Sequence, residues 1–291
     1  MEITASLVKK LRENSGVGMM DAKKALVENN GDMDASIDWL RKKGISKAEK
    51  KSGRTAAEGL ISYKKSSNVA VLIEVNSETD FVAKNTDFQK MVESITTNAL
   101  ECKNIEGLLK SKIDGKNIND FVSDHIAKIG ENINVRRLSS VSGKNIVSYI
   151  HNSVNNSMGK IGVIISYEGG NEEIAKKIAM HIAALKPISL SENDIDNEII
   201  EREKSIFFEQ AKQSGKPENV IQNIVNGKIK KFFEEVVLLK QKFVVDPDKS
   251  VEEILSSSSM NINEFVRLEV GEGIEKEIEN FADEVNKTAK G

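Results

Sequence analysis

The chain carries the same short pattern twice, and this repeat restricts its possible folds more than any other feature of the sequence. Two apolar runs at 59–63 and 68–74 are separated by polar turn residues, and a similar pair occurs at 145–149 and 160–165. Strand-length runs joined by a polar turn are typical of a β-hairpin. We therefore expect two related halves, each built on a hairpin of its own.

Each half continues in the same order after its hairpin. Apolar residues at helical spacing predict a helix from about 86 to 99 in the first half and from about 171 to 182 in the second. A third strand follows in each half, at 133–138 and at 265–270. The predicted fold class is therefore α+β, with two small three-stranded antiparallel sheets that each have helices on one face.

The second half contains an insertion at about 191–242. Two amphipathic segments lie on either side of Gly215-Lys216-Pro217, a sequence that interrupts a helix. This arrangement predicts an antiparallel helical hairpin, whose apolar residues can pack the two helices together. The same hairpin is a candidate surface for homodimerisation.

The first 45 residues predict three short helices. Thr4 can cap the first helix, which the glycines at 16–18 end, and the second helix covers about 19–28. Asp32 or Asp34 can cap the third. This order resembles a ubiquitin-associated (UBA) three-helix domain, which implies that partners bind the loop after the first helix and the helix that follows it.

The core of this head has few large side chains. Trp39 is expected at its centre, and Gly44 is placed to end the third helix. Met19 and Met20 occupy consecutive helix positions, which point about 100° apart. We therefore expect one methionine in the core and the other on the surface. The lysine-rich stretch at 46–58 is predicted to be a basic tether to the body.

Net charge, the length of the apolar runs and the motif content argue against a nucleic-acid-binding protein, a membrane protein and an enzyme, respectively. The net charge of −3 lacks a basic excess, and the longest apolar runs are strand-length, with no signal peptide at the start. Cys102 is the single cysteine, and His125, His151 and His181 are scattered without metal-ligand spacing. Nucleophile and phosphate-loop motifs are missing. We expect a cytoplasmic protein without catalytic residues, metal or cofactor.

One segment has the composition of a partner-binding tip. After the strand at 68–74, the chain continues through Thr79, Asp80, Phe81 and Val82 into the next predicted helix. An exposed Phe beside an Asp can fill an apolar pocket while it places negative charge against a metal or phosphate site. The alternative is that Phe81 packs into its own sheet and Asp80 only caps a helix.

Several motifs together resemble the elongation factor Ts family, and they extend from residue 11 to residue 276. The matching motifs are Leu11-Arg12-Glu13, Gly16-Val17-Gly18-Met19-Met20-Asp21-Ala22-Lys23-Lys24-Ala25-Leu26, Thr79-Asp80-Phe81-Val82-Ala83-Lys84-Asn85, Ile129-Gly130-Glu131-Asn132-Ile133-Asn134-Val135-Arg136-Arg137, Ser148-Tyr149-Ile150-His151, Met180-His181-Ile182-Ala183-Ala184, Gln213-Ser214-Gly215-Lys216-Pro217 and Glu269-Val270-Gly271-Glu272-Gly273-Ile274-Glu275-Lys276. The loop at 152–160 is longer and richer in Asn and Ser than the family pattern.

The resemblance implies a guanine-nucleotide exchange factor that binds elongation factor Tu, both GDP-bound and nucleotide-free. It implies that Asp80 and Phe81 act as a wedge that disturbs the magnesium site of that partner, and that the chain past Gly273 docks as a helix. The residues carried over as partner contacts are Thr79, Asp80, Phe81 and Val82 for the wedge, and Met19, Met20, Lys23, Ile129, Gly130 and His151 for the other contacts. The implied domains are a UBA-like head (1–45), a tether (46–58), two halves of the body (59–140 and 141–270) and a docking segment (271–291).

A second interpretation is a ribosome- or RNA-associated adaptor that uses the basic head. Residues 1–54 carry 12 Lys and Arg against 8 Asp and Glu. This adaptor would bind RNA with a steep salt dependence, whereas an exchange factor would bind a protein in competition with GDP.

Overall fold

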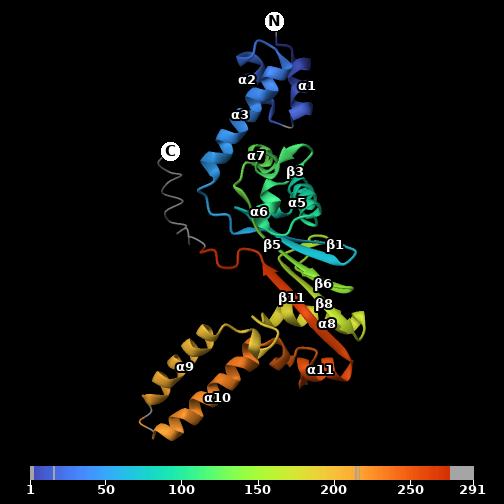
Figure 1. Ribbon diagram of the computed structural model, residues 1–291. Helices are drawn as coiled ribbons and strands as arrows, with labels where there is room; N and C mark the ends of the chain where they lie inside the picture. Colours follow the sequence, from blue (N-terminus) through green and yellow to red (C-terminus); the bar gives the residue numbers. More distant parts are fainter. Residues whose placement is uncertain (1–2, 16, 214, 216, 276–291) are drawn as a thin grey trace. The chain divides into compact units, whose positions relative to one another are not determined.

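The computed structural model describes residues 3–15, 17–213, 215 and 217–275 (Figure 1). Three predicted features lie partly or wholly outside these residues. Gly16 in the break after the first helix, Lys216 in the hairpin turn and most of the docking segment at 271–291 lie outside the described residues.

The chain divides into two compact units, and each is built from separate stretches of sequence. The first comprises Met1–Ser62, Ile73–Leu138 and Glu269–Gly291, and the second comprises Tyr63–Leu72 and Ser139–Leu268. This division differs from the predicted halves because β-strands of the first hairpin contribute residues to both units.

The elements follow one another in a mixed helix and strand order. Up to residue 142 they are α1 (Ala5–Ser15), α2 (Met19–Glu28), α3 (Met33–Lys51), β1 (Glu58–Ser66), β2 (Val69–Ser77), α4 (Asp80–Ala83), α5 (Thr86–Ala99), α6 (Ile105–Lys110), β3 (Lys112–Ile113), β4 (Lys116–Asn117), α7 (Ile118–Ile129) and β5 (Ile133–Ser142). They continue as β6 (Asn145–His151), β7 (Met158–Gly159), β8 (Ile161–Gly169), α8 (Glu172–Leu185), the 3-10 helix η1 (Glu192–Asp194), α9 (Asn197–Lys212), α10 (Glu218–Val236), the 3-10 helix η2 (Leu238–Lys240), β9 (Lys242–Phe243), β10 (Asp246–Ser250), α11 (Val251–Ser257) and β11 (Met260–Glu269).

The α+β class is confirmed, and so are both hairpins, but one predicted sheet has an additional strand. The second sheet has three strands in the order β11-β8-β6, as predicted. The first has four, in the order β5-β2-β1-β7. Its expected count of three is wrong because the chain after β6 turns back, and the backbone N–H of Tyr63 donates to the carbonyl of Ser157 at 2.8 Å.

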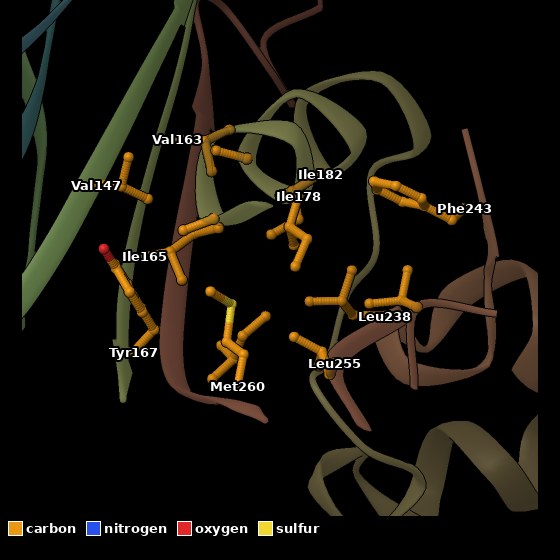
Figure 2. Packing of buried hydrophobic residues seen from close by; sticks show 14 of the residues in the cluster. Val147, Val163, Ile165, Tyr167, Ile178, Ile182, Leu238, Phe243, Leu255 and Met260 are labelled. Carbon is orange, nitrogen blue, oxygen red and sulfur yellow. The ribbon is translucent and has the colours of Figure 1, made fainter. Parts of the chain in front are cut away.

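The core of the second unit forms where helices cover its three-stranded sheet. Strands β6 and β8 pair antiparallel from Asn145↔Tyr167 to His151↔Ile161. Because side chains alternate along a strand, Val163, Ile165 and Tyr167 share one face, and all three belong to the buried cluster (Figure 2). Apolar residues of α8, η2 and α11 complete this cluster.

The head has the three predicted helices, but its core differs from the prediction. Thr4 and Asp32 cap α1 and α3 through their side chains, as expected. The buried cluster consists of Val8, Leu11, Ala22, Ala25, Leu26 and Leu40. Trp39 is only half-buried at its edge, so its predicted central position is wrong. Leucines of all three helices and the small alanines of α2 fill the centre instead.

Helix α3 continues seven residues beyond its predicted end. Gly44 was expected to end the helix, but α3 extends to Lys51, so the predicted tether at 46–58 is helical in its first part. A Cβ at Gly44 would lie 3.3 Å from Cβ of Ala127 on α7. The glycine therefore permits close packing of α3 against α7 and does not act as a helix terminator.

The helical hairpin of the second unit is confirmed. Helices α9 and α10 lie side by side (Figure 1). Ala211, Ile221, Val225 and Ile229 are buried between them, and Phe207 and Phe233 pack against this cluster. The apolar residues thus hold the two helices together, and homodimerisation through them stays a prediction.

A second repeated element, which was not predicted, connects the helices to the last strand of each unit. In the first unit the hairpin of β3 and β4 precedes α7, and in the second the hairpin of β9 and β10 precedes α11. Asn117 and Ser250 occupy the same place in the two copies, and each side chain accepts a backbone N–H at the start of its helix.

A buried carboxylate anchors the last described turn of the first unit. Glu74 on β2 is fully buried, and Arg136 Nη1 lies 3.1 Å from each of its oxygens. Arg137 also donates to it, the backbone N–H of Gly271 donates at 2.8 Å, and the Asn76 amide donates at 3.0 Å. Charge-assisted bonds from two arginines compensate the cost of burying this charge.

We expect Glu74→Ala to lower the free energy of unfolding by about 3 kcal/mol, because it leaves two arginine side chains without their buried acceptor. Urea denaturation measures this loss. Glu168→Ala, at an exposed position of β8, is the matched control and should change stability by less than about 0.5 kcal/mol. Equal stability of the two variants would contradict a structural role for Glu74.

His181 is fully buried in the second unit and is held as the neutral imidazole. The backbone N–H of Val244 donates to Nδ1 at 3.1 Å, so Nε2 carries the hydrogen and donates to Gln241 Oε1 at 2.8 Å. Burial lowers the pKa of His181 below its usual value of 6.5, and the bond to Gln241 opposes this only in part.

This lowered pKa predicts a pH dependence of stability. The unfolded chain binds the proton more readily, so the neutral imidazole's stabilisation is fully present above pH 6.5 and is lost as the pH falls towards the folded pKa. Urea denaturation from pH 7.5 to pH 5 should show falling stability in the wild type and a flatter profile in His181→Gln. A profile unchanged by this substitution would contradict the assignment, and His151→Gln serves as the control at an exposed histidine.

Candidate functional site

The segment Thr79–Val82 forms the start of a very short helix directly after β2. Helix α4 has only four residues, Asp80–Ala83, and Thr79 is its N-cap residue with extended backbone angles. Thr79 itself is half-buried. The sequence therefore changes from a buried strand to an exposed helical turn within three residues.

The two faces of α4 differ sharply in exposure. The Phe81 side chain is 77% exposed, whereas Val82 and Ala83 are 7% and 1% exposed. Consecutive helix positions point about 100° apart, so burial of Val82 and Ala83 directs Phe81 outwards. The alternative in which Phe81 packs into its own sheet is wrong, and the N-cap of α4 is Thr79 and not Asp80.

Asp80 lies beside this phenylalanine with about half of its side chain exposed. Lys84 Nζ is 2.9 Å from Asp80 Oδ2, and it lies 5.8 Å from the centre of the Phe81 ring. An exposed pair one helical turn apart contributes only about 0.3–0.5 kcal/mol. The ion pair with Lys84 therefore holds the Asp80 carboxylate only weakly.

The predicted contacts of the head lie on the outer side of α2. Met19 is 51% exposed and Met20 is 79% exposed, and Lys23 is exposed as well. The expectation that one methionine would be buried is wrong, because Ala22, Ala25 and Leu26 fill the inner face of this helix. Val27, seven positions after Met20 on the same face, is also 54% exposed and was not predicted.

Ile129 and Gly130 lie where α7 ends. Gly130 is the C-cap residue with φ of 92°, a left-handed conformation that glycine adopts without strain. Its N–H donates to the carbonyl of Ile126 at 2.9 Å. Ile129 is half-buried and Gly130 is exposed, so this turn presents backbone more than side chain.

His151 is the last residue of β6 in the second unit and is exposed. The hydroxyl of Tyr149, two positions earlier on the same face of the strand, lies 3.0 Å from His151 Nδ1. The loop at 152–160 begins directly after it, and Asn152 adopts a positive φ of 49°.

Neither a metal cluster nor a membrane helix was found in the described part of the chain. Among those residues, no three His, Cys, Asp or Glu side chains come together as a metal site requires. Cys102 is half-buried and forms no disulfide. No described helix has the length and apolar character to cross a bilayer.

Comparison with known proteins identifies the class. The family model described as Elongation factor TS matches residues 78–272. The chain is 54% identical to elongation factor Ts of Roseobacter denitrificans and 53% identical to that of Jannaschia sp., each over 291 residues and all of both chains. Elongation factor Ts of Paracoccus denitrificans is 53% identical, again with complete coverage.

These matches define a translation elongation factor with a nucleotide-exchange role. The chain belongs to the elongation factor Ts family.

The two faces of α4 predict opposite stability effects for neighbouring substitutions. Val82→Ala should lower the free energy of unfolding by about 1–3 kcal/mol, because it removes buried methyl groups and leaves a cavity. Phe81→Ala should change it by less than about 0.5 kcal/mol, because Phe81 lies in water. Urea denaturation followed by circular dichroism compares them. A larger loss for Phe81→Ala than for Val82→Ala would contradict the described orientation of α4.

Proposed function

We propose that this chain binds elongation factor Tu, in its GDP-bound and nucleotide-free forms, and accelerates GDP release by a wedge made of Asp80 and Phe81. The observation that carries the proposal is the 77% exposure of Phe81 on a helix whose opposite face is buried. A large apolar side chain kept in water beside a carboxylate is suited to enter a pocket of another protein.

The energy required limits what Phe81 does alone. A thousandfold acceleration needs about 4 kcal/mol of stabilisation of the transition state for release. Burial of one phenylalanine contributes about 1.5–3 kcal/mol. A second effect is therefore required, and Asp80 supplies it by placing negative charge where the partner holds its magnesium ion.

The pairing of Asp80 with Lys84 fits this role. In the free chain the exposed lysine accompanies the carboxylate at 2.9 Å, and such a pair is weak in water. In the proposed complex the carboxylate lies in a site from which water is excluded, where its field acts more strongly on a metal ion or its ligands. The magnesium coordination then loosens, and GDP leaves faster.

The remaining contacts hold the factor on its partner. Met19, Met20 and Lys23 offer an apolar surface with one positive charge on α2, and methionine side chains adapt to varied surfaces. The turn at 129–130 and His151 are proposed to add polar contacts. We place the action in the cytoplasm, where translation elongation takes place.

Exchange in this scheme has no covalent step and needs no cofactor. Thermodynamic linkage requires that GDP weaken binding of the factor by the same ratio as the factor weakens binding of GDP. The factor therefore speeds the exchange but leaves the equilibrium between nucleotides unchanged.

The decisive test is release of fluorescent GDP from elongation factor Tu with wild-type and Phe81→Ala factor. We expect the maximum acceleration to fall by about tenfold or more, since the lost burial corresponds to at least 1.4 kcal/mol. Ile206→Ala, at a 39% exposed position of α9, is the control for loss of an exposed apolar side chain.

Asp80→Asn removes the negative charge of the wedge. In the same GDP-release measurement, it should reduce the acceleration in the presence of Mg²⁺. Circular dichroism verifies that the variants are folded. Rates for Phe81→Ala equal to those of the wild type, at saturating factor, would overturn the proposed wedge.

A further inference from the structure

Helix α4 is too short to fix its own direction. A four-residue helix contains about one intrahelical hydrogen bond, and isolated helices of this length do not form in water. Burial of Val82 and Ala83 anchors its inner face, but the start of the helix needs separate restraints. Those restraints come from the turn between α7 and β5, which is 52 positions away in the sequence.

Glu131 in that turn binds the first residue of the segment with both carboxylate oxygens. The Thr79 backbone N–H donates to Glu131 Oε2 at 2.9 Å, and the Thr79 hydroxyl donates to Oε1 at 2.6 Å. Bidentate acceptance by an ionised carboxylate is strong and directional. It satisfies a backbone donor at the start of α4, where no intrahelical acceptor exists.

A second contact runs in the opposite direction between the same two segments. The Asn132 backbone N–H donates to Glu78 Oε1 at 2.5 Å. Asn132 is itself buried, and its amide donates to the carbonyl of Arg54 at 2.7 Å. Each segment thus supplies one carboxylate that binds the other: Glu131 accepts from Thr79, and Glu78 accepts from Asn132.

We propose that Glu131 is a positioning residue of the exchange reaction, which sets the direction of α4 and so aims Asp80 and Phe81 at the partner. This inference rests on the proposed wedge. Loss of the carboxylate leaves Phe81 exposed but lets the start of α4 take several orientations, of which only some present the ring correctly. Binding must then order the segment, and this cost appears in the exchange rate.

The experiment measures GDP release from elongation factor Tu, by stopped flow over a range of factor concentrations, for the full-length chain. Glu131→Ala should lower the maximum acceleration about tenfold to a hundredfold, since it removes two charge-assisted hydrogen bonds. Glu131→Gln retains one acceptor and should show a smaller loss. Glu93→Ala, an exposed glutamate on α5 in the same unit, is the control and should match the wild type.

A background without the wedge separates positioning from general destabilisation. If Glu131 acts through the wedge, Glu131→Ala should cost less than about twofold in a background that carries both Asp80→Asn and Phe81→Ala, because neither the charge nor the ring remains to be aimed. A further loss of about tenfold in that background would show that Glu131 acts elsewhere and would overturn the inference.

Two further outcomes keep this inference distinct from the proposed function. If Phe81→Ala has no effect, the wedge itself fails, and the proposed function fails with it. If Phe81→Ala is impaired while Glu131→Ala equals the wild type, the wedge stands and only the positioning role is overturned. Should Glu131→Ala not fold, Thr79→Val removes the hydroxyl donor alone, and it must show a measurable loss that disappears in the background with both Asp80→Asn and Phe81→Ala.

Discussion

The exposed tip of the first unit depends on one constraint: a phenylalanine must stay in water while its neighbours are buried. Burial of Phe81 within the chain would gain about 1.5–3 kcal/mol, so an unrestrained segment would fold inwards. Burial of Val82 and Ala83 prevents this, because both cannot stay in the core if the helix turns over. The exposed ring is therefore a consequence of how α4 is anchored, and binding to a partner can recover the free energy that folding leaves unused.

The rest of the first unit provides a support for this short helix. Strand β2, which leads into α4, is buried along most of its length, and Glu74 near its end is bound by Arg136 and Arg137. Arg137 also donates to the carbonyl of Glu269 at 2.7 Å, so the same arginine connects β5 to the end of β11. Polar groups of different segments thus meet at one buried carboxylate and its two arginines, and these bonds restrain backbone that the apolar core alone would leave free.

The sequence predicted the elements whose signals are local. Apolar spacing and turn residues predict both hairpins, the helical insertion, α5 and α8. For Phe81, the sequence allowed either an exposed ring or a ring packed into its own sheet. The errors depend on distant contacts. Gly44 lies within α3 and does not end it, because the glycine serves the close contact with Ala127. Met20 is exposed because alanines fill the inner face of α2. The hydrogen bonds between Glu131 and Thr79 could not be predicted, because nothing in the sequence around Glu131 indicates a partner 52 positions away.

The proposed wedge acts on the magnesium ion of the partner, so the most direct experiment varies that ion. GDP dissociation from elongation factor Tu is measured with and without the factor, in excess Mg²⁺ and again after chelation of the metal. The proposed mechanism predicts that the acceleration by the factor falls by about tenfold or more once Mg²⁺ is removed, because the ion is no longer there to be disturbed. An acceleration of the same size under both conditions would contradict it.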